Sequence, residues 1–181
     1  MFLDRDGVIV VPHFRDGRSF APRRLEDLKF YGDAPEALAL LKAAGYVVVV
    51  VTNQPDVGNG LTPAAVVEAM HDRLRAQLPV DAIKVCLHGQ DEHCRCRKPS
   101  PGMIVESAQE LDIDLDRSVM VGDRASDVAA GAAAGCSTIF IDLGYAEPKP
   151  TGATHIVASL GEAVRVILDS SKRDNLRGDG A

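Results

Sequence analysis

The chain has 181 residues, of which 46% are hydrophobic, 4% are aromatic and none is tryptophan. This length suits one domain with a core of Val, Leu, Ile and Ala side chains. The net charge of −6 argues against a surface for duplex nucleic acid, which needs a broad basic face, but it allows a small phosphate ligand. We expect no membrane span and no signal peptide before the first strand. We also expect a cytoplasmic protein that is a monomer.

The stretch from Met1 to Val10 contains the first candidate site residues, and the other candidates are interpreted relative to it. An apolar run ends in the carboxylates Asp4 and Asp6, and Gly7 and a second apolar run follow. The first run predicts a buried strand, and open α/β sheets bind their ligands at the carboxyl ends of strands. Of two carboxylates placed there, one can attack an electrophile and the other can move a proton. Taken alone, the pattern fits a strand ending in a solvated Asp–Gly turn equally well, and the short run before Asp4 leaves an upstream start open.

Strands and helices alternate along the rest of the chain. Residues 11–32 show no clear helix or strand pattern, and we interpret them as a long loop. After this loop the pattern predicts strands over residues 46–51, 82–87, 118–121, 137–141 and 154–157. Helices are predicted before, between and after these strands: from Asp33 to about Ala44, from Thr62–Pro63, from Ser100–Pro101 to about Leu111, an Ala-rich helix to about Gly135, and from a Ser159–Glu162 capping box to about Leu168. This alternation predicts a doubly wound, Rossmann-like parallel sheet in one domain over residues 1–169. We interpret the polar residues 170–181 as a disordered tail.

Polar side chains follow several of these strands. They are Asp4 and Asp6, then Thr52, Asn53 and Gln54, then Lys98 in the loop after the third strand, and Asp123 with Asp127. Because the carboxyl ends of parallel strands meet at one edge, we expect these groups to converge. A nucleophilic carboxylate, a divalent cation held by carboxylates, and a hydroxyl with an ammonium to position the phosphate oxygens make a phosphoryl-transfer site plausible.

Four motifs in this order resemble those of the haloacid dehalogenase (HAD) superfamily, and they are FLDRDGV, VVVVVTNQ, CRKPSPGM and VGDRASD. The similarity extends from Phe2 to about Leu168. It implies Asp4 as the nucleophile and an Mg²⁺ ligand, and Asp6 as the general acid/base that also binds Mg²⁺ through its carbonyl. It further implies that Thr52 and Lys98 hold the phosphoryl group and that Asp123 completes the Mg²⁺ site. Asp127 is then a neighbour of these ligands that does not itself bind the metal.

The spacing of the motifs leaves no room for a folded cap domain. The gaps between Asp4 and Thr52 and between Thr52 and Lys98 are filled by elements of the scaffold. We therefore expect an open site, shaped by residues 11–32, residues 54–60 and the loop before Lys98.

A second cluster consists of Cys86, His88, Cys94 and Cys96. Three thiolates and an imidazole form a closed tetrahedral set typical of structural zinc, whereas the alternative is a chance cluster of buried thiols. The pattern resembles the zinc-binding loop of the histidinol-phosphatase and heptose-bisphosphate phosphatase branch of the superfamily. Zinc would fold a loop too polar to fold by burial and would bring its last residues to the site. We expect His93 to be solvated and Cys136 to lie in the core.

The leading hypothesis is an Mg²⁺-dependent phosphatase that acts on a small phosphorylated metabolite. The resemblance implies two candidate substrates, D-glycero-D-manno-heptose 1,7-bisphosphate (or a related sugar phosphate) and histidinol phosphate. We favour the sugar bisphosphate because Arg97, Arg124 and the arginines of residues 11–32 can hold a second phosphate. The run Pro101–Met103 also resembles the heptose branch, but the short gap between His88 and Cys94 resembles the histidinol branch. Histidinol phosphate is therefore the alternative. Its amine requires an acidic residue at the entrance of the site, for which Asp56 is the obvious candidate.

Two hypotheses of other classes remain at this point. One is a catalytically idle phosphate-binding module, which the presence of Asp4, Asp6, Lys98 and Asp123 disfavours. The other is a phosphatase for DNA 3′ ends, against which the acidic charge and the few aromatic residues count.

Overall fold

The structure is a computed structural model that describes residues 1–178, with the side chains of residues 1–170. Six parallel strands form one sheet in the spatial order β5-β4-β1-β6-β7-β8. Their bounds are β1 (Phe2–Leu3), β4 (Val49–Asn53), β5 (Ala82–Cys86), β6 (Val119–Gly122), β7 (Ser137–Ile141) and β8 (His155–Val157). The predicted doubly wound parallel sheet is confirmed.

The direction of the winding reverses between β1 and β6. The chain runs outward from β1 through β4 to β5, and then returns to place β6 beside β1, with Leu3 paired to Val121. A reversal of this kind opens a crevice at the carboxyl ends of the two strands, where ligands bind in such sheets. The topology therefore places Asp4 and Asp123, which follow β1 and β6, at this crevice.

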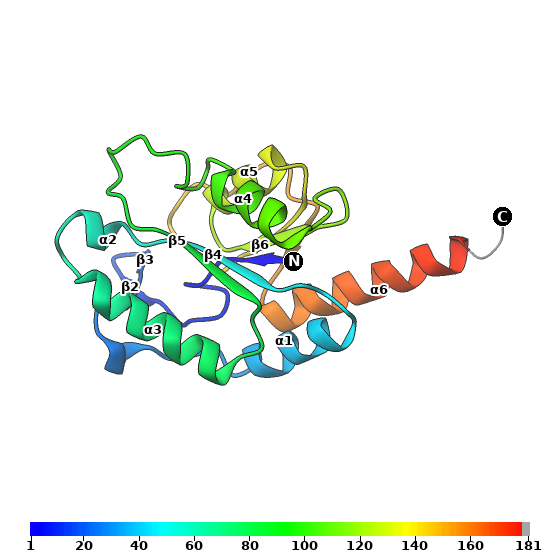
Figure 1. The fold of residues 1–181 in the computed structure, drawn as a ribbon, viewed down its shortest axis with the longest axis horizontal. Coiled ribbons are helices and arrows are strands. Elements are labelled where there is room, and N and C mark those ends of the chain that lie inside the picture. Colours follow the sequence, from blue (N-terminus) through cyan, green and yellow to red (C-terminus); the bar gives the residue numbers. More distant parts are fainter. Residues whose placement is uncertain (179–181) are drawn as a thin grey trace.

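Helices cover both faces of the sheet (Figure 1). One layer contains α1 (Ala34–Ala43), α3 (Ala64–Gln77) and α6 (Leu160–Gly178), and the opposite layer contains α4 (Gly102–Leu111) and α5 (Ala125–Ala133). Because successive side chains of a strand point to opposite faces, Val50 packs with the first layer and Val49 and Val51 with the second. Burial on both faces explains why these strands are continuous apolar runs.

The predicted helices are present, with differences at their ends. In α1, the buried face consists of Ala34, Ala37, Leu38 and Leu41. Asp33 precedes this helix but does not cap it, because its Oδ2 accepts a hydrogen bond from Gly161 N, 2.9 Å away at the start of α6. Helix α6 itself continues to Gly178, beyond the predicted end near Leu168. The disordered tail stays a prediction, and residues 179–181 lie outside the described part of the chain.

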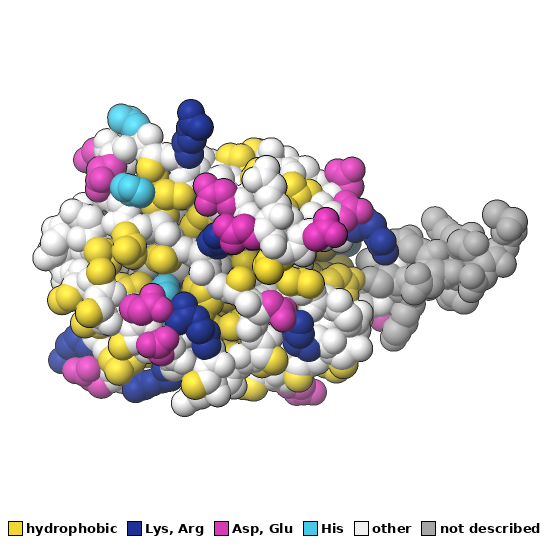
Figure 2. All heavy atoms as spheres, viewed as in Figure 1, with side chains coloured by type: hydrophobic (Ala, Val, Ile, Leu, Met, Phe, Trp, Pro, Cys, Tyr) yellow, Lys and Arg dark blue, Asp and Glu magenta, His cyan; other side chains and the backbone are white. Residues whose placement is uncertain are grey.

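The segments between the motifs contain small elements that the sequence pattern did not predict. Residues 11–32 include a hairpin of β2 (His13–Arg15) and β3 (Arg18–Phe20) and a 3-10 turn, η1 (Leu25–Asp27), while residues 54–60 include α2 (Pro55–Gly58). These elements and the scaffold helices account for the described segments before Lys98, and no cap domain lies among them. On the face drawn in Figure 2, acidic and basic side chains are interspersed over the described residues. No helix in the described part of the chain combines the length and the apolar character that a membrane crossing requires.

Candidate active site

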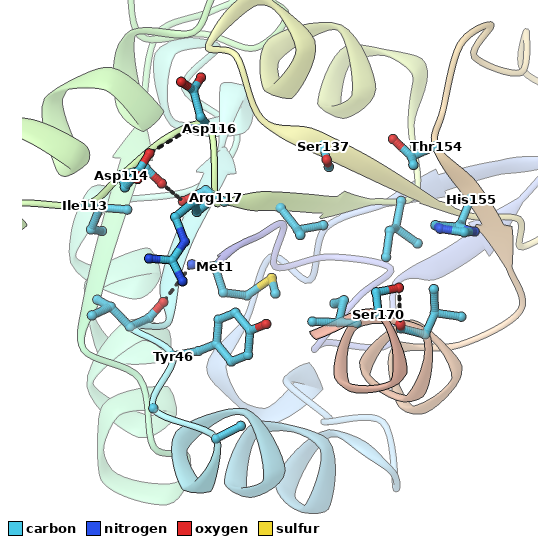
Figure 3. Close-up of a pocket in the computed structure, with 18 of the residues that line it drawn as sticks. Met1, Tyr46, Ile113, Asp114, Asp116, Arg117, Ser137, Thr154, His155 and Ser170 are labelled. Carbon is cyan, nitrogen blue, oxygen red and sulfur yellow. Dashed lines mark hydrogen bonds between the residues drawn. The ribbon is translucent and has the colours of Figure 1, made fainter. Parts of the chain in front are cut away.

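Two hollows of similar size lie at opposite edges of the sheet. The hollow at the amino ends of the strands has a volume of about 790 Å³ and includes Met1, Tyr46 and Ser137 in its wall (Figure 3). The hollow at the carboxyl ends has a volume of about 820 Å³, and its wall includes Asp4, Asp6, Lys98, Asp127 and the hairpin strand Arg18–Phe20. Only the second is lined by residues from all four motifs, so we take it as the candidate active site.

Lys98 is the centre of the charge cluster at this edge. Its Nζ lies 2.8 Å from Asp4 Oδ1 and 2.7 Å from Asp127 Oδ1, and it donates a hydrogen bond of 2.7 Å to the carbonyl oxygen of Val51. Burial alone would lower the pKa of Lys98, but the two carboxylates outweigh this effect and raise the pKa above its ordinary value. The lysine is therefore a fixed positive charge beside Asp4.

Three carboxylates converge at the carboxyl ends of β1 and β6. Asp4, Asp123 and Asp127 each have an oxygen within 4.8 Å of the others. The resemblance places Asp127 behind the metal ligands, whereas the structure places it directly in the cluster, against Lys98. Its Oδ2 also accepts a hydrogen bond of 2.9 Å from Arg124 N, which fixes it at the start of α5.

Asp123 shows that this cluster fits a divalent cation. Burial, followed by the negative charges of Asp4 and Asp127, raises the pKa of Asp123 well above its usual range. Its Oδ2 accepts a hydrogen bond of 2.6 Å from Tyr145 Oη, but among the described residues its buried Oδ1 has no hydrogen-bond partner. Mg²⁺ prefers carboxylate oxygens, and a cation would both satisfy this oxygen and offset the negative charge.

Gly7 makes the close approach of these groups possible. It has a φ of +89°, and a Cβ atom at this position would lie 2.0 Å from Asp123 Oδ2. Only glycine therefore fits at this position of the first motif, directly against Asp123.

Asp6 lies apart from the three clustered carboxylates and is held by two side chains. Arg5 donates to both of its carboxylate oxygens, at distances from 2.9 to 3.2 Å. Gln54 Nε2 donates a hydrogen bond of 2.7 Å to Asp6 Oδ2 and another of 2.8 Å to Thr52 Oγ1. The second motif thus fixes the side chain of Asp6, and its own Thr52 is buried.

Asn53 connects the second motif to the third. Its Nδ2 donates a hydrogen bond of 3.0 Å to Lys98 O, and its Oδ1 accepts one of 3.1 Å from Lys98 N. Both polar atoms of the amide are therefore used to hold the backbone of Lys98. This contact places the lysine at the end of β4, although 45 positions separate the two residues.

The arginines around the cleft differ in how far they are already paired. Arg124 donates to Glu147 Oε2 at 3.1 Å and to Ser19 Oγ at 2.7 Å, which ties the β2–β3 hairpin to the loop after β7. Arg97 also lines the cleft, and its buried Nη1 has no hydrogen-bond partner among the described residues. Arg97 is thus the better prepared of the two predicted arginines to bind an anion.

The four predicted zinc ligands come together beside this site. His88 Nδ1 lies 3.5 Å from Cys86 Sγ and 3.3 Å from Cys96 Sγ, and Cys94 Sγ lies 3.5 and 3.4 Å from the same two sulfur atoms. Zinc–sulfur bonds of about 2.3 Å in a tetrahedron imply ligand separations of roughly 3.8 Å, so the cluster is close to the size that zinc requires. His93 is exposed and Cys136 is buried in the core, as predicted.

Three residues of the site were not predicted from the sequence. Arg5 and Tyr145 contact Asp6 and Asp123 directly, and His71 on α3 lies behind Arg5. Arg5 could have been noticed because it stands between the two motif carboxylates. His71 and Tyr145 carry no local signal, because only the fold brings them to the site.

The comparisons with known proteins agree with this geometry. Residues 95–163 match the HAD-hydrolase-like family. The D-glycero-β-D-manno-heptose-1,7-bisphosphate 7-phosphatase of Pseudomonas putida is 38% identical over 152 residues, which are 81% of this chain and 84% of the relative. The α-anomer 7-phosphatase of Mycobacterium tuberculosis is 36% identical over 156 residues, 78% of each chain.

Solved structures give the same result. The D,D-heptose 1,7-bisphosphate phosphatase of Bordetella bronchiseptica, crystallised with magnesium and phosphate, superposes with a TM-score of 0.81 at 32% identity, over 94% of this chain and 98% of that one. A HAD-like phosphatase of Mesorhizobium loti superposes with a TM-score of 0.72 at 29% identity, over 92% and 84% of the two chains.

Proposed function

The chain belongs to the HAD-like phosphatases, and we propose that it removes one phosphate from a sugar bisphosphate, D-glycero-D-manno-heptose 1,7-bisphosphate. The observation that carries the proposal is the pairing of buried Lys98 with Asp4 at the carboxyl edge, below a cleft that Arg97 lines. The names of relatives at 36–38% identity support this substrate. Because these names include both anomers, both anomers belong in the assay.

The residues of this chain divide the reaction between them. The Asp4 carboxylate forms a bond to phosphorus while the bond from phosphorus to the sugar oxygen breaks, and Asp6 gives its proton to that oxygen. Water then attacks the phosphorus of the aspartyl phosphate, Asp6 takes a proton from the water, and the bond to Asp4 breaks. Lys98 keeps Asp4 in place and offsets negative charge on the phosphoryl oxygens.

Two metal ions belong to this proposal. Asp4, Asp123 and the main-chain carbonyl of Asp6 would hold Mg²⁺, which supplies charge neutralisation for the phosphoryl group when it is bound. The four ligands of the loop, Cys86, His88, Cys94 and Cys96, would hold a structural Zn²⁺ with no position open to substrate. We propose that this zinc acts through geometry alone, because the loop that it closes leads directly to Arg97 and Lys98.

The charges around the cleft favour a bisphosphate over histidinol phosphate. Arg97 lines the cleft and makes no ion pair among the described residues, so its guanidinium can bind the phosphate that is not cleaved. The predicted acidic partner for the amine of histidinol is Asp56, but its Oδ2 lies 2.6 Å from Arg23 Nε. Its charge is therefore already offset, so the acidic partner that the amine of histidinol requires is not free.

The test is a side-by-side measurement of kcat/KM on the heptose bisphosphate and on histidinol phosphate, with and without Mg²⁺. We expect Mg²⁺-dependent phosphate release with a clear preference for the bisphosphate. Asp4→Asn should abolish turnover without unfolding the protein, because Asn is nearly isosteric but cannot form the acyl phosphate. A preference for histidinol phosphate would reject the substrate, and phosphate release by Asp4→Asn near the wild-type rate would reject the nucleophile.

Arg97→Ala provides a second test of the substrate. If Arg97 holds the second phosphate, this variant loses more activity on the bisphosphate than on an aryl phosphate, which has a single phosphate. Equal losses would mean that Arg97 contacts the transferred phosphoryl group instead. The monomeric state, the cytoplasmic location and the lack of nucleic-acid binding stay predictions.

A further inference from the structure

Arg5 is a fully buried cation whose charge faces an active-site carboxylate. Its side chain has no exposed surface, and its Nε and Nη2 both approach the two oxygens of Asp6, with a shortest distance of 2.9 Å. Among the described residues, the structure gives Arg5 no other ion pair. Burial of a guanidinium is costly unless it is paired and hydrogen-bonded, so this arrangement is not a casual surface contact.

The backbone of Arg5 is fixed by the turn that follows β1. Its carbonyl oxygen accepts hydrogen bonds from Ile9 N at 2.9 Å and from Val10 N at 2.8 Å. The base of the side chain therefore cannot move without opening the turn. What remains to be fixed is the guanidinium at the far end of three flexible carbon atoms.

His71 on α3 fixes that end. Its Nε2 lies 3.2 Å from Arg5 Nη1, and its side chain is 1% exposed. Burial, together with the neighbouring charge of Arg5, lowers the pKa of His71 to about 4, so the ring is neutral near pH 7. A neutral ring can accept the Arg5 hydrogen bond at Nε2 and carry its proton on Nδ1, which lies 3.9 Å from Glu68 Oε2.

We infer that Arg5 and His71 are positioning residues, which hold the Asp6 carboxylate where it can give its proton to the leaving oxygen. This inference rests on the proposed role of Asp6 as general acid. Asp6 is partly exposed at the cleft, with 14% of its side-chain surface accessible, and its contacts with Arg5 and Gln54 restrict its rotation. Proton transfer requires an aligned donor, and a displacement of about 1 Å can cost on the order of 100-fold in rate.

The positioning role predicts that the loss of activity in a variant depends on the leaving group, whereas a purely structural role predicts no such dependence. Dinitrophenolate leaves as a stable anion and needs no proton, whereas the oxygen of a phenol or a sugar leaves poorly unless it is protonated. A misplaced Asp6 should therefore slow phenyl phosphate hydrolysis and spare 2,4-dinitrophenyl phosphate hydrolysis. Because both rates come from one preparation, the ratio of the two kcat/KM values is independent of the fraction of enzyme that is folded.

The experiment compares this ratio among five variants, each first checked for folding by thermal unfolding. Asp6→Asn is the reference for loss of the acid, and Leu74→Met, a volume-conserving change on the same face of α3, is the matched control. His71→Leu removes the hydrogen-bond acceptor for Arg5, whereas His71→Gln keeps an acceptor there. Arg5→Lys keeps the positive charge but loses the planar guanidinium that can donate two hydrogen bonds to Asp6. We expect the ratio to change by roughly 10- to 100-fold in His71→Leu and Arg5→Lys. His71→Gln should restore it at least in part, and Leu74→Met should leave it unchanged.

Two results would contradict the positioning role, and they separate its failure from the failure of the proposed function. If Asp6→Asn changes the ratio but His71→Leu and Arg5→Lys do not, the positioning role is wrong and the proposed function stands. If Asp6→Asn itself slows both substrates equally, Asp6 is not the general acid, and the inference falls with that part of the proposed function.

Discussion

Acidification from pH 7 to pH 5 is expected to lower the free energy of unfolding by roughly 2 kcal/mol through His71 alone. Burial, followed by the positive charge of Arg5, lowers the pKa of His71 from 6.5 in the unfolded chain to about 4 in the folded protein. Between these values the unfolded state binds more protons than the folded state. Stability is therefore complete above the unfolded pKa and is lost as the pH falls toward the folded one.

The size of the effect follows from the two pKa values. The interval from 6.5 to about 4 corresponds to about 3.5 kcal/mol in full, at about 1.4 kcal/mol for each pH unit. At pH 5 most of the unfolded rings are protonated and most of the folded rings are not, so about two thirds of this energy is already lost, on the order of 2 kcal/mol.

Urea unfolding of the wild type and of His71→Leu at both pH values measures this contribution. Leucine does not titrate, so the variant should lose about 2 kcal/mol less than the wild type between pH 7 and pH 5. The other four histidines are present in both proteins, so their contributions cancel in the comparison. Equal losses in the two proteins would refute the argument that His71 is buried in its neutral form.

Three further predictions concern the charged and metal-binding groups. Lys98→Met leaves Asp4 and a second buried carboxylate without their cation, so urea unfolding without divalent ions should show a loss of about 3–5 kcal/mol. Cys94→Ser removes a thiolate from the proposed zinc site, so metal analysis should find the zinc content falling from near one per chain toward zero. Tyr145→Phe removes the hydroxyl that holds Asp123 Oδ2, so calorimetric titration should show Mg²⁺ affinity reduced by about 10-fold.

Matched control substitutions separate these specific effects from a general loss of folding. Lys84→Met breaks an ion pair of 2.6 Å with the exposed Glu110, and it should cost about 1 kcal/mol or less. Cys136→Ser changes a core cysteine outside the cluster and should leave the zinc content unchanged. A loss below about 1 kcal/mol in Lys98→Met, full zinc content in Cys94→Ser, or unchanged Mg²⁺ affinity in Tyr145→Phe would each contradict the corresponding contact.

The sequence by itself determined the architecture and the identity of the motif residues. Periods of apolar residues predicted the alternating strands and helices, because a parallel sheet buried on both faces requires continuous apolar strands. The motifs stand at strand ends, so the convergence of Asp4, Asp123 and Lys98 followed from the topology of a parallel sheet. The cluster of cysteines and His88 was likewise visible, because its ligands are separated by no more than ten positions.

Only the tertiary structure decided which of these groups are free and which are held. Arg124 and Arg97 are equivalent in the sequence, but the hairpin brings Ser19 to Arg124 and leaves a donor of Arg97 unpaired. Tyr145 reaches Asp123 because the loop after β7 folds back over the carboxyl edge. His71 reaches Arg5 across 66 positions because α3 packs on the face of the sheet to which Arg5 points. Such contacts depend on how helices and loops pack over the sheet, and that packing is set by side chains throughout the core and not by the local pattern around any one residue.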